Sequence, residues 1–320
     1  MHTWLVVLTC CAACCAHAAD VYPNKPIRII ITVAPGGGAD ITARAVGQKL
    51  SEAWGQQVVV DNRPGGNGIV GMDIAAHASP DGYTIVEGTI GPVAVNPSLY
   101  SKLPYDPVND FAPIARAVTA LNMLVVYPSL PAHSVKELIA YAKAYPNKLN
   151  YAEIGVGSAM HMGMEQFKFM TKTEINRVSY RGTAPAISDV VAGTVDLMFT
   201  GPPSAKSMSE GGKLKVLAVA SPDRIVLLPD VPTVAEAGVP GYTMASWFGL
   251  LAPAKTSTTI VERLSAETKT AVNNQVFKDR MKSVGLEIDG GTPEAMLETM
   301  QSDTQRWAEL IKATGITIPQ

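Results

Sequence analysis

Cysteine is confined to the N-terminal end of this 320-residue chain. All four cysteines fall within the first nineteen residues, at Cys10, Cys11, Cys14 and Cys15. A mature chain that begins after this segment therefore contains no cysteine. Such a chain can form no disulfide, no thiolate metal site and no catalytic thiol.

Histidine and positive charge are also in short supply. Residues 20–320 contain three widely separated histidines, His77, His133 and His161, so we expect no metal site and no cofactor. The formal net charge is -2, and without a basic surplus we expect no nucleic-acid partner. A Walker loop, a G-x-S-x-G elbow and an H-E-x-x-H motif are all missing. These absences favour a protein that is not an enzyme.

A long apolar run occurs only at the N-terminus. Residues 1–19 contain no Lys, Arg, Asp or Glu, open with Leu5-Val6-Val7-Leu8 and end in small residues. The run is short for a spanning helix, and no stop-transfer pattern follows it. We predict a signal peptide over residues 1–19 and an exported protein. An uncleaved anchor is the alternative, because positive charge is missing from the start. A lipid on Cys10 is disfavoured, because Thr9 is a poor lipoprotein match.

Strand and helix patterns alternate along most of the chain. A β-branched run over residues 27–33 is typical of a strand buried on both faces, and a helical pattern follows from residue 41 to about 53. The same alternation returns in the middle of the chain, with a strand at 149–154 and a helix at 158–170. The C-terminal part is mostly helical and ends in a helix with Thr292 as N-cap. The pattern predicts an α/β fold with helices on both faces of mostly parallel sheets.

Two apolar segments that end at a proline, residues 122–127 and 246–252, bracket the middle α/β block. We interpret them as crossovers between two lobes. The first lobe then comprises residues 21–124 and 249–320, and the second comprises residues 125–248. This arrangement predicts a clamshell that holds a ligand between its lobes.

A glycine-rich turn, Pro35-Gly36-Gly37-Gly38-Ala39-Asp40, joins the first strand to its helix. In open α/β sheets, ligands bind at the carboxyl ends of the strands, where helix N-termini present free N–H groups. Glycine lets a ligand approach the backbone, and the helix dipole favours an anion. We interpret Asp40 as the N-cap of this helix. A tight turn without a ligand is the alternative.

A second such turn, Gly155-Val156-Gly157-Ser158, opens the helix after residue 154. We predict that Ser158 caps this helix and that Gly157 and Ser158 face the same anion. His161 lies one turn into the helix, where packing or an indirect hydrogen bond is favoured over ligand contact.

Two further turns between a strand and a helix complete the candidate site in the second lobe. Gly182 and Thr183 contribute N–H groups in one of them, and Thr200 begins the other. The stretch from Gly66 to Gly71 matches the dinucleotide pattern G-x-G-x-x-G. A lone match is weak evidence, and four residues separate it from the preceding strand.

Motifs spread over nearly the whole mature chain resemble those of the receptors of tripartite tricarboxylate transporters, the Bug family of Bordetella. The matching stretches run in family order: residues 22–28, 35–40, 96–100, 103–106, 155–158 with His161, 193–199, 228–238 and 247–250.

This resemblance implies a two-lobed periplasmic binding protein of type II, the Venus-flytrap fold. It also implies a ligand that is a carboxylic acid, an acidic amino acid or a related small amide or vitamin. The ligand carboxylate would lie between the loop that carries Gly36, Gly37, Gly38 and Asp40 and the loop that carries Gly157 and Ser158. Many relatives have Asp where this chain has Thr200, which disfavours an amino-acid ligand and leaves room for a plain organic acid.

We therefore predict a monomeric periplasmic receptor that captures a small carboxylate and delivers it to membrane transporter subunits. The alternative is a ligand-dependent partner of a membrane signalling kinase, because the same fold serves both functions.

Overall fold

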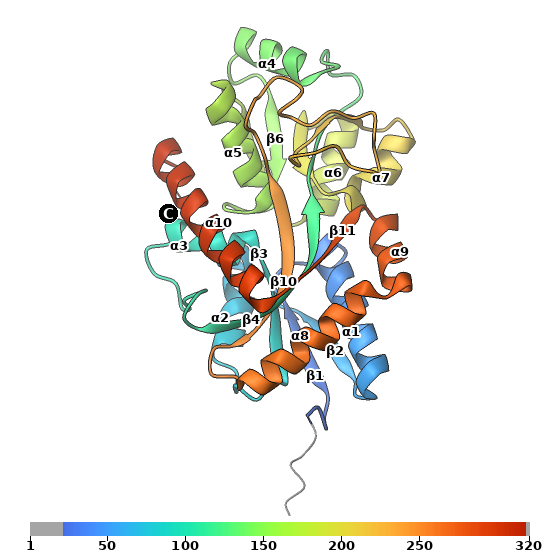
Figure 1. The fold of residues 1–320 in the computed structure, drawn as a ribbon. Coiled ribbons are helices and arrows are strands. Elements are labelled where there is room, and N and C mark those ends of the chain that lie inside the picture. Colours follow the sequence, from blue (N-terminus) through green and yellow to red (C-terminus); the bar gives the residue numbers. More distant parts are fainter. Residues whose placement is uncertain (1–21, 318–320) are drawn as a thin grey trace, which may run out of the picture.

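The computed structural model describes residues 22–317, so the predicted signal segment and its cysteines lie outside the described residues. The chain forms two β-sheets, each flanked by helices, one above the other in Figure 1. This architecture confirms the predicted two-lobed α/β fold, but both sheets are mixed and not mostly parallel as predicted, because β10 in the first sheet and β5 in the second run antiparallel to their neighbours. No helix between residues 22 and 317 is long and apolar enough to cross a lipid bilayer.

The first sheet has six strands in the order β11-β4-β10-β3-β1-β2. Its strands are β1 (Ile27–Ile31), β2 (Val58–Asn62), β3 (Thr84–Thr89), β4 (Phe111–Leu121), β10 (Ala245–Pro253) and β11 (Leu286–Gly291). The helical elements of this lobe are α1 (Gly38–Trp54), η1 (Gly66–Gly68), α2 (Ile69–Ala76), η2 (Gly91–Val95), α3 (Asn96–Leu99), α8 (Thr258–Asn273), α9 (Gln275–Ser283) and α10 (Pro293–Thr314).

The second sheet has five strands in the order β7-β6-β8-β5-β9. Its strands are β5 (Met123–Val126), β6 (Asn150–Glu153), β7 (Asn176–Ser179), β8 (Leu197–Thr200) and β9 (Lys215–Val219). The helices around it are α4 (Val135–Ala144), α5 (Ala159–Thr171), α6 (Thr183–Ala192) and α7 (Pro202–Glu210).

Strand directions make the carboxyl ends of the parallel strands in the two sheets face each other. In the first sheet β1, β2 and β3 are parallel, and β10 runs antiparallel to both β3 and β4. Hence β3 and β4 end at the same edge. In the second sheet β6, β7 and β8 are parallel, and β5 runs antiparallel to β8 and β9. Because a single residue, Asn122, separates the end of β4 from the start of β5, both edges lie at the same crossover.

The chain changes sheets between Leu121 and Met123 and has returned to the first sheet by Ala245. Two strands of the first sheet, β4 and β11, have no counterpart among the predicted elements. The predicted N-cap of the last helix is confirmed, because the Thr292 side chain accepts a hydrogen bond from the Ala295 N–H. The helix ends at its C-cap Gly315, which is left-handed at φ 67°.

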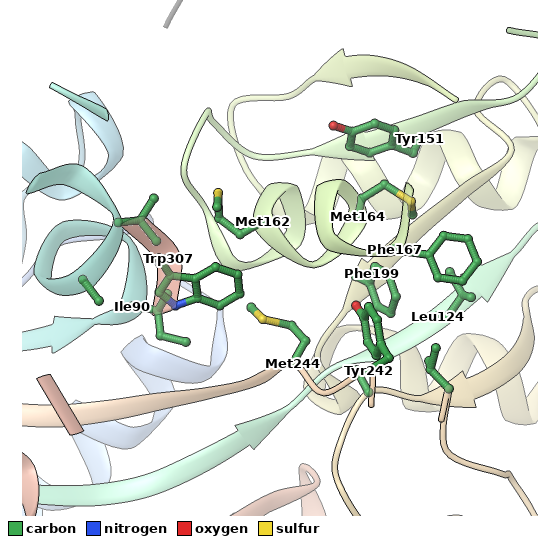
Figure 2. Close-up of a cluster of buried hydrophobic side chains, with 14 of the residues drawn as sticks. Ile90, Leu124, Tyr151, Met162, Met164, Phe167, Phe199, Tyr242, Met244 and Trp307 are labelled. Carbon is green, nitrogen blue, oxygen red and sulfur yellow. The ribbon is translucent and has the colours of Figure 1, made fainter. Parts of the chain in front are cut away.

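A single apolar cluster connects the two lobes on one side of the molecule. In Figure 2, Met244, which precedes β10, lies between Trp307 of α10 and the rings of Phe199 and Tyr242. Met162 of α5 belongs to the same cluster. The rings of Phe199 and Tyr242 are stacked, with centroids 5.8 Å apart. The C-terminal helix is therefore anchored in the same core as the second lobe.

We predict that Trp307→Ala lowers the free energy of unfolding by about 3–5 kcal/mol, because truncating a buried tryptophan leaves a cavity. The Trp307 side chain is fully buried, whereas Gln305 on the same helix is exposed. Urea denaturation should show the loss for Trp307→Ala and a change within about 0.5 kcal/mol for Gln305→Ala. Equal losses in the two variants would contradict the anchoring role of Trp307.

Candidate ligand-binding site

The structure brings every candidate residue to the two facing edges. In the first lobe, Pro35, Gly36 and Gly37 lie between β1 and α1, and Gly38 and Asp40 lie in the first turn of α1. In the second lobe, Gly157, Ser158 and His161 lie where β6 leads into α5, Gly182 and Thr183 lie where β7 leads into α6, and Thr200 is the last residue of β8. Four strand-to-helix turns thus converge on one region, as a ligand held between two lobes requires.

The three consecutive glycines of the first loop differ in what surrounds them. Gly36 has a left-handed φ of 92°, a conformation that favours glycine. Nothing lies within 4 Å of a Cβ built on Gly36 or Gly37, so both positions border open space. A Cβ on Gly38 would lie 2.9 Å from the ring of Phe248. Gly38 is therefore required by packing, and Gly36 and Gly37 are the positions that leave room for a ligand.

The predicted role of Asp40 as N-cap is wrong. Gly37 is the N-cap of α1, and Asp40 lies in the first turn, where it accepts a hydrogen bond from the Gly36 N–H at 3.1 Å. Its carboxylate also pairs with Arg44 at 2.9 Å and accepts a bond from Asn62 at 3.0 Å. Burial alone would raise the pKa of Asp40, but these hydrogen bonds outweigh it and lower the pKa. The carboxylate of Asp40 is therefore ionised, and its hydrogen bonds stabilise the conformation of the loop.

The second loop uses its own N–H groups differently from the prediction. Ser158 is the N-cap of α5, as predicted, and its hydroxyl accepts from the His161 N–H at 3.3 Å. However, the Gly157 N–H donates to Nδ1 of His161 at 3.2 Å, and the Ser158 N–H donates to the Gly155 carbonyl at 3.0 Å. The N–H groups that the helix itself leaves unpaired belong to the first turn of α5, beginning at Ala159.

His161 holds this loop in place as a neutral side chain. It is buried, and burial lowers its pKa to about 4, even though Glu165 acts in the opposite direction. Because Nδ1 accepts a hydrogen bond from Gly157, the ring proton is assigned to Nε2. The indirect role favoured for His161 agrees with this geometry.

Two buried glutamates near the candidate loops were not identified from the sequence. Glu153 ends β6, and its carboxylate accepts hydrogen bonds from the Gly155 N–H and from the Ser179 hydroxyl of β7. Glu87 lies in β3 of the first lobe and is also buried. The available signal was a carboxylate inside an otherwise apolar strand just before a turn.

The remaining turns of the second lobe also border the facing edge. Nothing lies within 4 Å of a Cβ built on Gly182. The hydroxyl of Thr200 is fully buried, and no residue that the structure describes is its hydrogen-bond partner. The same is true of the Asn122 amide nitrogen at the crossover. Uncompensated polar groups of this kind are concentrated at binding sites or satisfied by water.

Glycines also let the lobes touch on both flanks of the site. A Cβ on Gly157 of the second lobe would lie 2.8 Å from Asn67 Nδ2 and 2.8 Å from Leu99 Cδ1 of the first. On the opposite flank, a Cβ on Gly285 of the first lobe would lie 2.2 Å from Cβ of Pro202 in the second. Both glycines have positive φ, 85° and 73°. The lobes are therefore in close contact on two sides.

Comparison with known proteins identifies the family. The model of the tripartite tricarboxylate transporter family receptor matches residues 42–316. The chain is 33% identical over 299 residues to BugT of Bordetella pertussis, covering 93% of this chain and 92% of that protein.

Two solved structures are similar over almost their full length. Rpa4515 of R. palustris, whose structure contains adipate, shares 37% identity with a TM-score of 0.88, covering 92% of this chain and 99% of that one. MatC from Rhodopseudomonas palustris, solved with bound malate, shares 29% identity with a TM-score of 0.85, covering 91% and 100%. The chain belongs to the tripartite tricarboxylate transporter receptor family, to which the Bug proteins also belong.

Proposed function

We propose that this protein is a periplasmic receptor that closes two lobes around a small di- or tricarboxylate and delivers it to membrane transporter subunits. The observation that carries the proposal is the convergence of the open Gly36–Gly37 turn with the start of α5 at the facing edges of two sheets. Helix N-termini stabilise anions by about 0.3–1 kcal/mol each at exposed sites. The adipate and malate in related receptors support this ligand class.

In the proposed complex the first lobe contributes the turn from Pro35 to Gly38, and Asp40 fixes the shape of that turn. The second lobe contributes Ser158, Gly182, Thr183 and Thr200, and His161 fixes the Gly157 backbone. The unpartnered Thr200 hydroxyl is a donor for a ligand oxygen. Thr200 provides no negative charge to pair with the amino group of an amino-acid ligand, and this favours a plain organic acid as the ligand.

The proposed lobes comprise residues 21–124 with 249–320 and residues 125–248, and the protein acts as a monomer. The change of sheet near Asn122 and again before Ala245 supports these boundaries, because each lies within a few residues of one of them.

Adipate and malate are the first probes of this function. A ligand that binds only the folded state stabilises that state by RT ln(1 + [L]/Kd), and the melting temperature therefore rises. Isothermal calorimetry on the mature chain should give saturable binding of at least one acid. A chain that binds neither these two acids nor other short di- or tricarboxylates contradicts the proposal.

We predict that Gly37→Ala lowers affinity for such an acid at least tenfold, about 1.4 kcal/mol, because the new methyl enters the open space of the loop. Gly37 has an ordinary φ of -85°, so the fold should lose at most about 1 kcal/mol, from a poorer N-cap. Calorimetry and urea denaturation on the same variant separate the two effects.

Two companion variants make this test specific. Gly37→Ser restores a favoured N-cap, so it should keep the stability and still lose affinity. Gly38→Ala should instead lose stability, by about 1–3 kcal/mol, because its methyl meets the ring of Phe248. If Gly37→Ala and Gly37→Ser bind the acid with normal affinity, the loop has only a structural role and the ligand site lies elsewhere.

We also predict that Gly157→Ala impairs lobe closure. The added methyl would overlap Asn67 and Leu99 of the other lobe, so ligand affinity should fall at least tenfold and the liganded protein should be more extended in small-angle X-ray scattering. Combining Gly157→Ala with Asn67→Gly and Leu99→Ala removes the two nearest obstacles and leaves Val95, whose Cγ1 lies 3.2 Å from the Cβ position, so the compact form should be largely restored.

Gly155→Ala is the matched control for backbone strain. Gly155 lies in the same loop with a φ of 132°, but nothing lies within 4 Å of its Cβ position. An equally extended Gly155→Ala protein, or a combined variant that stays extended, would show that strain and not lobe contact is responsible.

A further inference from the structure

Glu87 occupies an apolar position of the first sheet, two residues before the end of β3. Its Cα is paired with Ile31 of β1 and with Leu250 of β10. Because side chains alternate along a strand, Glu87 lies on the same face as Ile85, the face covered by α1. Ile31, Leu250 and Ile85 all belong to one apolar cluster. The residues paired with Glu87 on both neighbouring strands are thus apolar.

One oxygen of this carboxyl lacks a partner. Glu87 is 1% exposed, and its Oε2 has no hydrogen-bond partner within residues 22–317. Glu153, the buried glutamate of the second lobe, differs because its two oxygens accept from Gly155 and Ser179. A buried carboxyl with an unused oxygen carries a free-energy cost that needs a compensating role.

Among the described residues, no ion pair involves Glu87. From α1, the charge of Asp40 acts on Glu87, and Asp40 is itself paired with Arg44 at 2.9 Å. From β1, Arg28 alternates to the opposite face and pairs with Asp61, and β10 contains no titratable side chain. Burial, and next the negative charge of Asp40, raises the pKa of Glu87 well above its usual value. Both effects favour the protonated, neutral form of this carboxyl.

Glu87 also lies close beneath the candidate anion loop. Two residues further along β3, Thr89 is paired with Phe248, and the ring of Phe248 is the nearest neighbour of a Cβ on Gly38 at the start of α1. The same first turn of α1 carries Asp40, whose charge acts on Glu87. The protonation state of Glu87 thus acts directly on the potential at this helix start.

We propose that Glu87 is a specificity-determining residue of this receptor, whose neutral carboxyl beneath the first turn of α1 makes the binding of a carboxylate ligand dependent on a retained proton. The inference rests on the proposed function. A helix N-terminus presents about half a positive charge, and a full negative charge on Glu87 would more than cancel it. The ligand and the Glu87 proton therefore stabilise each other, as reciprocal linkage requires.

The test measures affinity against pH in three proteins: the wild type, Glu87→Gln and Glu52→Gln. Glu87→Gln keeps the shape and fixes the neutral form, while Glu52→Gln makes the same chemical change at an exposed position of α1. The probes are adipate and malate, by calorimetry above about pH 6.5, where the acids themselves are ionised. Thermal unfolding confirms that each variant is folded.

We expect the affinity of the wild type to fall as pH rises through the pKa of Glu87, approaching tenfold per pH unit for one linked proton. Glu87→Gln should bind with little pH dependence, and Glu52→Gln should follow the wild type. Infrared spectra at neutral pH should show a protonated-carboxyl band in the wild type that is lost in Glu87→Gln and shifts when malate or adipate is added.

Two results overturn the inference while leaving the proposed function intact: parallel pH profiles of wild type and Glu87→Gln, or a carboxyl band that ligand does not move. A wild type that binds no short di- or tricarboxylate overturns the proposed function, and the inference falls with it.

Discussion

The direction in which the chain crosses between the lobes is the constraint on which the site depends. A single residue separates the end of β4 from the start of β5, and β10 is antiparallel to its neighbours β3 and β4. With this arrangement, all the parallel strands of both sheets end at the crossover. The loops after β1, β6, β7 and β8 then meet although they are far apart in sequence, and the positive ends of three helices, α1, α5 and α6, lie at one place. A reversed crossover would turn one set of loops away from the other.

Glycine serves three separate physical purposes in this region. At Gly36 it permits a left-handed backbone, at Gly37 it leaves open space, and at Gly38, Gly157 and Gly285 it permits contact with another segment. The lobes meet through two of these contacts, so the same residue type that admits a ligand also lets the lobes enclose it. A side chain on either flank would separate the lobes before the loops reached a small ligand between them.

Much of this arrangement could be predicted from the sequence, because caps and strand patterns are local signals. Ser158 and Thr292 cap helices where their side chains predict it. β4 was missed because Pro113 and Arg116 interrupt its apolar pattern, yet it has partners on both sides. Asp40 was misplaced because its partners, Arg44 and Asn62, depend on tertiary packing. The use of the Gly157 N–H by His161 is also invisible in a pattern of residue types, since it depends on a ring orientation.

The two buried glutamates have different roles in the two lobes: Glu153 stabilises a loop through hydrogen bonds, and Glu87 is proposed to link ligand binding to a proton. Each lies near the end of a strand that precedes the crossover edge, on β6 and β3. Glu153 has donors on two neighbouring segments, so its position ties a loop to a strand. Glu87 has apolar strand neighbours and an ionised Asp40 in the adjoining helix turn. Burial favours the protonated form of Glu87, and so its protonation state depends on every charge that enters the region. A ligand carboxylate is such a charge, and so the lobe that lacks donors for its glutamate is the one whose glutamate responds to binding.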